Sequence, residues 1–220
     1  MILVRHGQSH FNVHFAETRV DPGIVDPRLT EEGERQARAA SQSLANCGIE
    51  RIIASPYWRT LHTAEIIAAA LDLPVTIEPL VRERYSFTCD IGSLRQDLAR
   101  RWPKFSFGEL PERWWPEAEE SEAALAERCR SFRESHVTAK SWDGLLVDSH
   151  WGLIRGLTGE EVGNGVALRL DPVDGSAAPA FRAPHPPGPA RLSGGTIHDS
   201  QSRPREHRSR IWPRKPRSRS

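Results

Sequence analysis

Ile2-Leu3-Val4-Arg5-His6-Gly7 begins the chain with an apolar run that ends in a cation, an imidazole and a glycine. A short apolar run that stops at a glycine is typical of a buried strand leading into a loop, where β/α proteins keep their chemistry. The same pattern returns where Leu145-Leu146-Val147 leads to Ser149-His150-Trp151-Gly152. The sequence therefore predicts two strands whose ends present His6 and His150, side chains able to act as nucleophile, base or acid near neutral pH.

Helical stretches alternate with short apolar runs through the first 170 residues. Thr30 is predicted to cap a helix that stops at Gly48, and residues 51–54 follow as a strand. Ser55-Pro56 is predicted as the cap and first residue of the next helix, which places Arg59 in its opening turn, where an anion would bind. This alternation predicts one α/β domain, a three-layer α/β/α sandwich with a mostly parallel central sheet.

Residues 75–77 predict a further strand, after which residues 80–120 lose their periodicity and collect prolines and tryptophans. That segment is predicted to be an insert or lid beside the site. Its tryptophans would either stack on a substrate or form the insert's own small core. Ser121 is expected to cap a further helix, and residues 166–170 are predicted to be a final edge strand.

The net charge of +1 hides an asymmetry, because residues 176–220 hold ten Lys and Arg against two Asp and Glu. This segment is rich in Pro, Ser and Gly, and it lacks the apolar surface that would offset its ordering entropy. We expect a folded domain over residues 1–172 and a disordered basic tail over residues 173–220. The tail is expected to be a solvated extension, with weak contacts to nucleic acid or an acidic partner as the alternative.

Apolar stretches in the chain are too short to cross a bilayer, and no signal core precedes the first strand. No contact with a membrane is expected, and the expected location is cytoplasmic. The three cysteines are widely spaced without a CxxC pair, which indicates neither a disulfide framework nor a zinc site.

Five short motifs, in their order along the chain, resemble those of the histidine phosphatase superfamily, which also contains the phosphoglycerate mutases. The motifs are Arg5-His6-Gly7-Gln8-Ser9 with Asn12, Asp26-Pro27-Arg28-Leu29-Thr30 with Gly33, Ser55-Pro56 with Arg59-Thr60, Arg82-Glu83-Arg84, and Ser149-His150 with Gly152 and Arg155. The resemblance covers about residues 1–170 and implies the phosphoglycerate mutase-like form of the α/β/α fold.

The resemblance implies that His6 attacks phosphorus to form a phosphohistidine and that Glu83 protonates the leaving group. Splitting a very slow hydrolysis into two transfers replaces one high barrier by two lower ones. A backbone carbonyl near the loop is expected to hold His6 in one tautomer. Arg5, Arg59 and His150 are expected to assist His6 and Glu83 by holding the charged oxygens of the phosphoryl group. The expected substrate contacts are Arg5, Gly7, Asn12, Arg59, His150 and Trp151. Neither a metal nor a cofactor is expected.

The chain departs from the family pattern at Trp151, where a small glycine is usual, and after Arg155, where Thr158-Gly159 cuts the expected helix short. The long insert typical of phosphoglycerate mutases is not recognisable. The sequence therefore favours a phosphatase acting on a small-molecule phosphate monoester. The alternatives are a mutase-type phosphotransferase and a catalytically inactive module that binds a phosphorylated ligand. For the acid, Glu109 or Glu112 of the insert could replace Glu83.

Two competing patterns are present. Cys89 and Arg95 fit the Cys-x5-Arg loop of cysteine-dependent phosphatases, in which a thiolate is the nucleophile, but the flanking residues do not, which favours a chance match. His6, His10 and His14 repeat every four residues, as metal ligands on a helix would. Because the first of them follows a strand, the other two are expected at the surface or the pocket rim.

Overall fold

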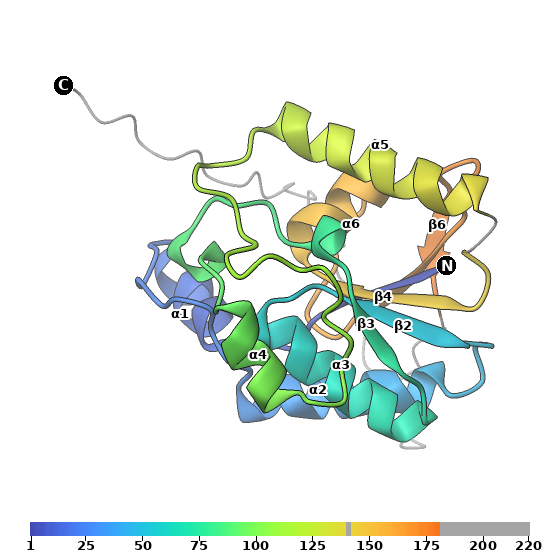
Figure 1. Cartoon of the computed structure of the whole chain (residues 1–220), viewed down its shortest axis with the longest axis horizontal. Coiled ribbons are helices and arrows are strands. Elements are labelled where there is room, and N and C mark those ends of the chain that lie inside the picture. The colour runs from blue at the N-terminus through green and yellow to red at the C-terminus, as the bar shows by residue number, and fades with distance from the viewer. Residues whose placement is uncertain (140–141, 181–220) are drawn as a thin grey trace, which may run out of the picture. The chain divides into compact units, whose positions relative to one another are not determined.

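A six-stranded sheet forms the centre of the structure, a computed structural model that describes residues 1–139 and 142–180 (Figure 1). The strands are β1 (Ile2–Arg5), β2 (Arg51–Ala54), β3 (Val75–Ile77), β4 (Leu145–Ser149), β5 (Ala167–Leu170) and β6 (Ala177–Pro179). Their order in the sheet is β3-β2-β4-β1-β5-β6. The first four in this order pair in parallel, whereas β5 and β6 are antiparallel. The predicted, mostly parallel sheet is confirmed.

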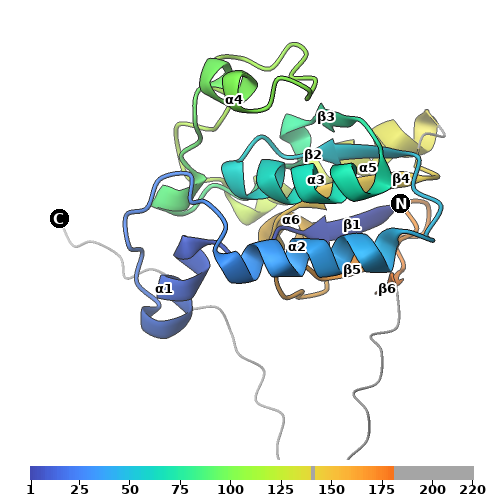
Figure 2. The same ribbon diagram turned by 90° about the horizontal axis from the view of Figure 1, so that it is seen from below.

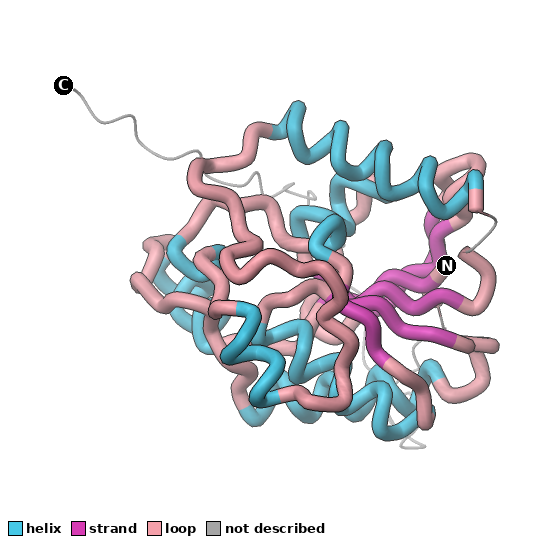
Figure 3. Tube along the Cα trace, in the orientation of Figure 1, coloured by secondary structure: helices cyan, strands magenta, loops and turns pink. Residues whose placement is uncertain are grey.

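Helices cover both faces of this sheet, as Figures 2 and 3 show. The described part of the chain contains the helices α1 (His10–Thr18), α2 (Glu31–Leu44), α3 (Trp58–Leu71), α4 (Arg95–Arg101), α5 (Glu122–Thr138) and α6 (Trp151–Thr158). The pair α2 and α3 lies against one face, and the pair α5 and α6 lies against the other. This arrangement is the three-layer α/β/α sandwich that the sequence predicted.

The core follows the alternation of side chains along each strand. On β1, Val4 packs into the cluster beneath α2 and α3, while Leu3 packs into the cluster beneath α5 and α6. Each buried large apolar side chain contributes about 1.5–3 kcal/mol relative to exposure. Because both faces are buried, the central strands read as continuous apolar runs, which is why they were recognisable in the sequence.

A close contact between two glycines fixes the loop after β1. A Cβ at Gly7 would lie 2.2 Å from the carbonyl oxygen of Gly33, and a Cβ at Gly33 would lie 2.1 Å from that of Gln8. Thr30 caps α2 as predicted, because its Oγ1 accepts the N–H of Gly33 at 3.1 Å. The loop that carries His6 is therefore held against the first turn of α2.

The insert over residues 80–120 contains more structure than its lack of periodicity indicated. It holds α4 and the 3₁₀ turn η2 (Thr88–Asp90), and it is preceded by the turn η1 (Pro79–Val81). Trp102 and Trp114 are buried in the main core beneath α2 and α3. Of the two hypotheses for the tryptophans, the structure supports packing, although the core is that of the whole domain.

Several predicted boundaries were wrong. Helix α3 begins at Trp58 rather than at Pro56, α1 occupies a segment predicted to be a loop, and α2 ends at Leu44, before Gly48. Residues 166–170 do not form an edge strand, because β6 pairs with β5 on its outer side. Residues 173–180, assigned to the tail, thus belong partly to the sheet. The rest of the predicted tail lies outside the described residues.

Across residues 1–139 and 142–180, no helix combines the length and the apolar character needed to cross a membrane.

Candidate active site

Parallel pairing brings the carboxyl ends of β1, β2 and β4 to one edge of the sheet. Arg5 is in register with Ser149, and Ala54 is in register with Asp148. The next residues therefore lie together, and the rings of His6 and His150 have centroids 5.1 Å apart. The structure thus joins the two histidines that the sequence placed at separate strand ends.

His6 is held as one tautomer. Its Nδ1 lies 2.7 Å from the carbonyl oxygen of Gly7, which can only accept, so Nδ1 carries the proton and Nε2 keeps its lone pair. Burial lowers the pKa of His6 well below its ordinary value, and the nearby charges of Arg59 and Arg5 lower it further. The ring is therefore neutral at pH 7, and its Nε2 is a nucleophilic atom.

His150 is held on both sides of its ring. Its Nδ1 accepts a hydrogen bond from Nε of Arg59 at 3.3 Å, so its Nε2 carries the proton and donates to Oγ of Ser55 at 2.8 Å. Burial lowers the pKa of His150 well below its ordinary value, and the positive charge of Arg59 lowers it further. In this arrangement His150 orients the guanidinium of Arg59.

Arg59 projects from the first turn of α3 and is 3% exposed. Besides its bond to His150, its Nη1 donates to the carbonyl oxygen of Cys89 at 2.8 Å, and its Nη2 donates to Oδ1 of Asp90 at 3.1 Å. A guanidinium has five N–H donors, so two remain for an anion. The insert therefore supplies part of the wall that holds this cation.

Glu83 lies at the N-terminus of α6, beside His150. Its Oε2 accepts the N–H of Gly152 at 3.2 Å, and its Oε1 accepts the N–H of Arg84 at 2.7 Å. A Cβ at Gly152 would lie 2.3 Å from Oε1, so only glycine admits the carboxyl here. Burial raises the pKa of Glu83, and the negative charge of Asp90 raises it further. Such a carboxyl keeps its proton more readily than an exposed one does.

Arg5 and Asn12 are both joined to the turn before β5. Nη1 of Arg5 donates to the carbonyl oxygen of Val162 at 2.7 Å. Burial lowers the pKa of Arg5 to about 10, which leaves its guanidinium charged at neutral pH. Asn164 donates its Nδ2 to the carbonyl oxygen of His6 and to Oδ1 of Asn12, at 3.1 Å each. As the expected substrate contact, Asn12 would donate a hydrogen bond through its Nδ2.

Trp151 begins α6 directly after His150, and it is half-buried. The guanidinium carbon of Arg155 lies 4.9 Å from its ring centroid, and Arg155 is itself paired with Glu122. The large side chain thus packs against Arg155 of the same helix. Gly159, in a left-handed conformation, ends this helix after eight residues, as the sequence indicated.

The competing patterns do not form sites. Burial raises the pKa of the Cys89 thiol well above its ordinary value, and the side chain of Arg95 pairs with Glu112. A buried thiol that keeps its proton is a poor nucleophile. Of the alternative acids, Glu112 is paired with Arg95 at the start of α4, and Glu109 is exposed.

The three histidines spaced four apart do not form a cluster, because His10 and His14 are exposed on α1 while His6 is buried at the end of β1. In the part of the chain that the structure describes, no group of His, Cys, Asp and Glu side chains has an arrangement that could hold a metal ion.

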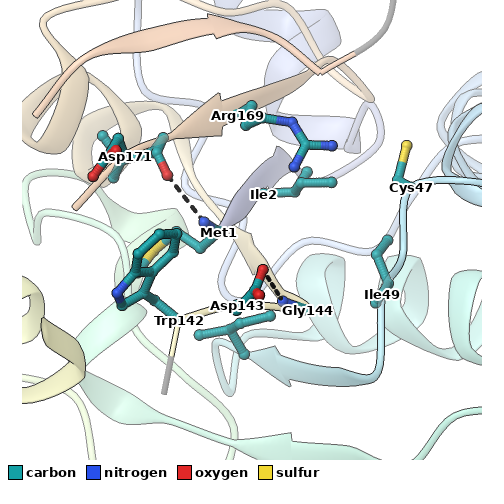
Figure 4. Close-up of a pocket in the computed structure, with 11 residues that line it drawn as sticks. Met1, Ile2, Cys47, Ile49, Trp142, Asp143, Gly144, Arg169 and Asp171 are labelled. Carbon is teal, nitrogen blue, oxygen red and sulfur yellow. Dashed lines mark hydrogen bonds between the residues drawn. The ribbon is translucent and has the colours of Figure 1, made fainter. Parts of the chain in front are cut away.

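A small cavity of about 130 Å³ lies at the other end of the central strands (Figure 4). It is lined where β1 and β4 begin, by residues that include Met1, Gly144 and Arg169. No predicted site residue lines it, so this cavity is separate from the histidine pair.

Three contacts of the site were missed by sequence reasoning. Ser55 was predicted only as a helix cap, yet it bonds to His150. Asn164, in the turn before β5, donates to the backbone carbonyl of His6. Asp90 gave no signal, because nothing in an aperiodic insert shows which carboxylate will reach Arg59.

Comparison with known proteins connects this geometry to a family. The model of the histidine phosphatase superfamily (branch 1) matches residues 1–169. The chain belongs to this superfamily. It is 34% identical over 155 residues to a protein of Proteus mirabilis named probable phosphoglycerate mutase GpmB, with 67% of each chain covered. A protein of the same name from Cronobacter sakazakii is 46% identical over 81 residues, which span 37% of this chain and 36% of that protein.

Solved structures of proteins named as phosphatases share the fold. A mycobacterial glucosyl-3-phosphoglycerate phosphatase in complex with VO3 has a TM-score of 0.56 at 23% identity, covering 78% of this chain and 90% of that one. A phosphoserine phosphatase of Entamoeba histolytica has a TM-score of 0.53 at 24% identity, covering 76% and 87%. Relatives of this chain thus include proteins named as mutases and proteins named as phosphatases.

Proposed function

We propose that this protein is a phosphatase that hydrolyses small-molecule phosphate monoesters through a phosphohistidine at His6. The observation that carries the proposal is the 2.7 Å hydrogen bond from Nδ1 of His6 to the carbonyl oxygen of Gly7, which leaves Nε2 unprotonated. In the first step this lone pair forms a bond to phosphorus while the bond to the ester oxygen breaks. A neutral, desolvated imidazole suits that attack, because it needs no prior proton loss.

The phosphoryl group keeps negative charge throughout the transfer, so fixed cations lower the barrier. Arg59 offers its two remaining N–H groups, and Arg5, on the same strand end as His6, adds a second guanidinium. His150 acts on the phosphate through Arg59, whose Nε it holds. This role differs from the direct contact expected from the sequence.

Glu83 is the proposed proton donor. Its raised pKa favours the protonated carboxyl, which can give its proton to the departing alkoxide. The resulting carboxylate then takes a proton from the water that attacks the phosphohistidine. This second step breaks the bond between Nε2 and phosphorus, releases inorganic phosphate and restores both side chains.

Hydrolysis of an aryl phosphate by the full chain tests the proposal, with His6→Ala and Cys89→Ser compared to the unchanged protein. We expect His6→Ala to lose activity by at least 1,000-fold, on the order of the effect of removing a nucleophile, and Cys89→Ser to retain it. A radiolabelled substrate should leave an acid-labile, base-stable phosphate on the unchanged protein and on Cys89→Ser, and none on His6→Ala. Activity that survives in His6→Ala contradicts the mechanism.

A mutase activity is the second candidate, because the relative from Proteus mirabilis carries that name. It would use the same phosphohistidine but return the phosphoryl group to a second hydroxyl instead of water. Incubation with 3-phosphoglycerate and 2,3-bisphosphoglycerate separates the two: formation of 2-phosphoglycerate indicates a mutase, and release of inorganic phosphate indicates a phosphatase. Binding of phosphate esters with neither product indicates an inactive binding module.

A further inference from the structure

Asp90 is a buried carboxylate of the insert that contacts the site but has no role in the reaction described so far. It lies in the turn η2 and is 1% exposed. Its Oδ1 accepts Nη2 of Arg59 at 3.1 Å, which forms an ion pair buried on both sides. Breaking a buried pair by removing one partner leaves the other charge uncompensated, so this contact has consequences for Arg59.

The turn around Asp90 is built to hold its carboxylate in place. Oδ2 accepts the N–H groups of Ser86 and Phe87 at 3.0 and 3.1 Å, and the hydroxyl of Tyr57 donates to the backbone carbonyl of Asp90 at 2.6 Å. The adjacent carbonyl of Cys89 receives Nη1 of Arg59. Two consecutive residues of the insert therefore bind both terminal nitrogens of the guanidinium.

We propose that Asp90 is a positioning residue: with the carbonyl of Cys89 it fixes the plane of the Arg59 guanidinium, so that the two remaining N–H groups of Arg59 face the phosphoryl group. The proposal rests on the phosphatase function proposed above. It assigns the insert a direct part in the reaction, since residues 88–90 complete the wall that α3 and β4 begin.

Asp90 also acts on the proposed acid by its charge. The charged groups that face Glu83 are Arg5 from β1, Arg59 from α3 and Asp90 from η2. Burial raises the pKa of both carboxyls, but Arg59 opposes the rise most strongly at Asp90, with which it is paired. Repulsion between the two carboxylates favours a proton on one of them, and Glu83 is the one favoured, because Asp90 is paired with Arg59. The groups facing Asp90 besides these are Tyr57 and Cys89, both neutral at pH 7.

Asp90→Asn keeps the shape of the side chain and removes its charge. We expect the KM for an aryl phosphate to rise on the order of tenfold, because Arg59 loses a charge-assisted partner. With an alkyl phosphate, whose leaving group needs a proton, the basic limb of the kcat/KM profile is the one where Glu83 loses its proton. It should move to lower pH by on the order of one unit, since a repelling charge is gone. Asp90→Ala should show the same changes and weaker binding of inorganic phosphate.

The matched control is Asp26→Asn. Asp26 is also buried and binds the insert, through Ser93, and the start of α3, through the N–H of Trp58, but it does not bond to Arg59. We expect no movement of the basic limb in the kcat/KM profile of Asp26→Asn. The proposal is overturned if Asp90→Asn has the same pH profile and the same KM as the unchanged protein. It is also overturned if Asp90→Asn and Asp26→Asn shift equally, which would indicate general loosening of the insert.

The two proposals fail differently. If the unchanged protein does not hydrolyse phosphate esters, the phosphatase proposal fails. The positioning of Arg59 is then judged by fluorescence titration with inorganic phosphate, in which Asp90→Ala must bind more weakly than Asp26→Ala. Equal binding by these two variants refutes it.

Discussion

Asp148 is a buried carboxyl in the middle of the sheet, and its removal should stabilise the protein in a way that depends on pH. It lies on β4 between Val4 of β1 and Ala54 of β2 and is fully buried. Neither of its carboxylate oxygens has a hydrogen-bond partner within the described residues. Burial raises the pKa of Asp148 well above its ordinary value, because water cannot solvate the charge there.

The sign of the effect follows from proton binding. The unfolded chain releases the Asp148 proton near pH 4, whereas the folded chain keeps it to higher pH. Between these two pKa values the unfolded state binds fewer protons, so the free energy of unfolding falls as pH rises, by about 1.4 kcal/mol per unit. The loss is absent below pH 4, and at pH 7 it amounts to at most about 4 kcal/mol, three units at this slope.

Asp148→Asn removes the titration and keeps the shape, so its stability relative to the unchanged protein should increase from pH 4.5 towards pH 7.5. An unpaired amide costs about 1–3 kcal/mol at every pH, as an unpaired protonated carboxyl does, and this cost does not affect the slope. Urea unfolding followed by circular dichroism at four pH values measures it. Asp26, Asp90 and Glu83 also have raised pKa values through burial, and only the difference between variants isolates Asp148.

Asp97→Asn on α4, where the side chain is 45% exposed, reports the effect of losing a carboxylate that water reaches. A difference between Asp148→Asn and the unchanged protein that stays constant from pH 4.5 to 7.5 would refute the reasoning. Such a result would mean that the carboxylate finds a partner or water in the fold.

Three further substitutions separate the roles of site and core. Gly152→Ala would put a methyl group 2.3 Å from Oε1 of Glu83 and displace the acid. The kcat should therefore fall about 100-fold for alkyl phosphates, and far less for p-nitrophenyl phosphate, whose leaving group needs no proton. Gly163→Ala, where there is room for the methyl group, is the control. Ser55→Ala leaves Nε2 of His150 without its acceptor and should lower stability by about 1–3 kcal/mol in urea unfolding. Trp102→Ala should cost about 3–5 kcal/mol of stability with KM unchanged, since this ring is 2% exposed in the core. A raised KM with full stability would instead favour stacking of the tryptophan on the substrate.

The sequence predicted the parts of the fold that are set by local pattern. Strands β1 and β4 were recognisable because both of their faces are buried, and the cap at Thr30 because its hydroxyl acts within one turn. The start of α3 was misplaced because Ser55 bonds to His150 instead of capping a helix. Helix α1 was missed because only Phe11 and Phe15 are buried on it, which is too little for a periodic signal.

The candidate site likewise combines features set by local sequence pattern with features set by contacts between distant segments. The positions of His6 and Arg59 beside one another could be expected because each follows a strand in a short motif. The position of Asp90 could not, since its partnership with Arg59 depends on how a long insert returns to α3. The hydrogen bonds of His150 could not be predicted either, because sequence shows that an imidazole is present but not that Arg59 and Ser55 occupy both its nitrogens.

Strand β6 has a consequence for how the chain can be shortened. It covers the outer side of β5, pairing Leu168 with Pro179 and Leu170 with Ala177. A chain cut at residue 172 would expose the free N–H and C=O groups of β5, flanked by buried apolar side chains, and such an edge recruits strands from other molecules. Truncation there should therefore yield aggregates in which the bare edges pair between copies, whereas a cut after residue 180 retains the native cover.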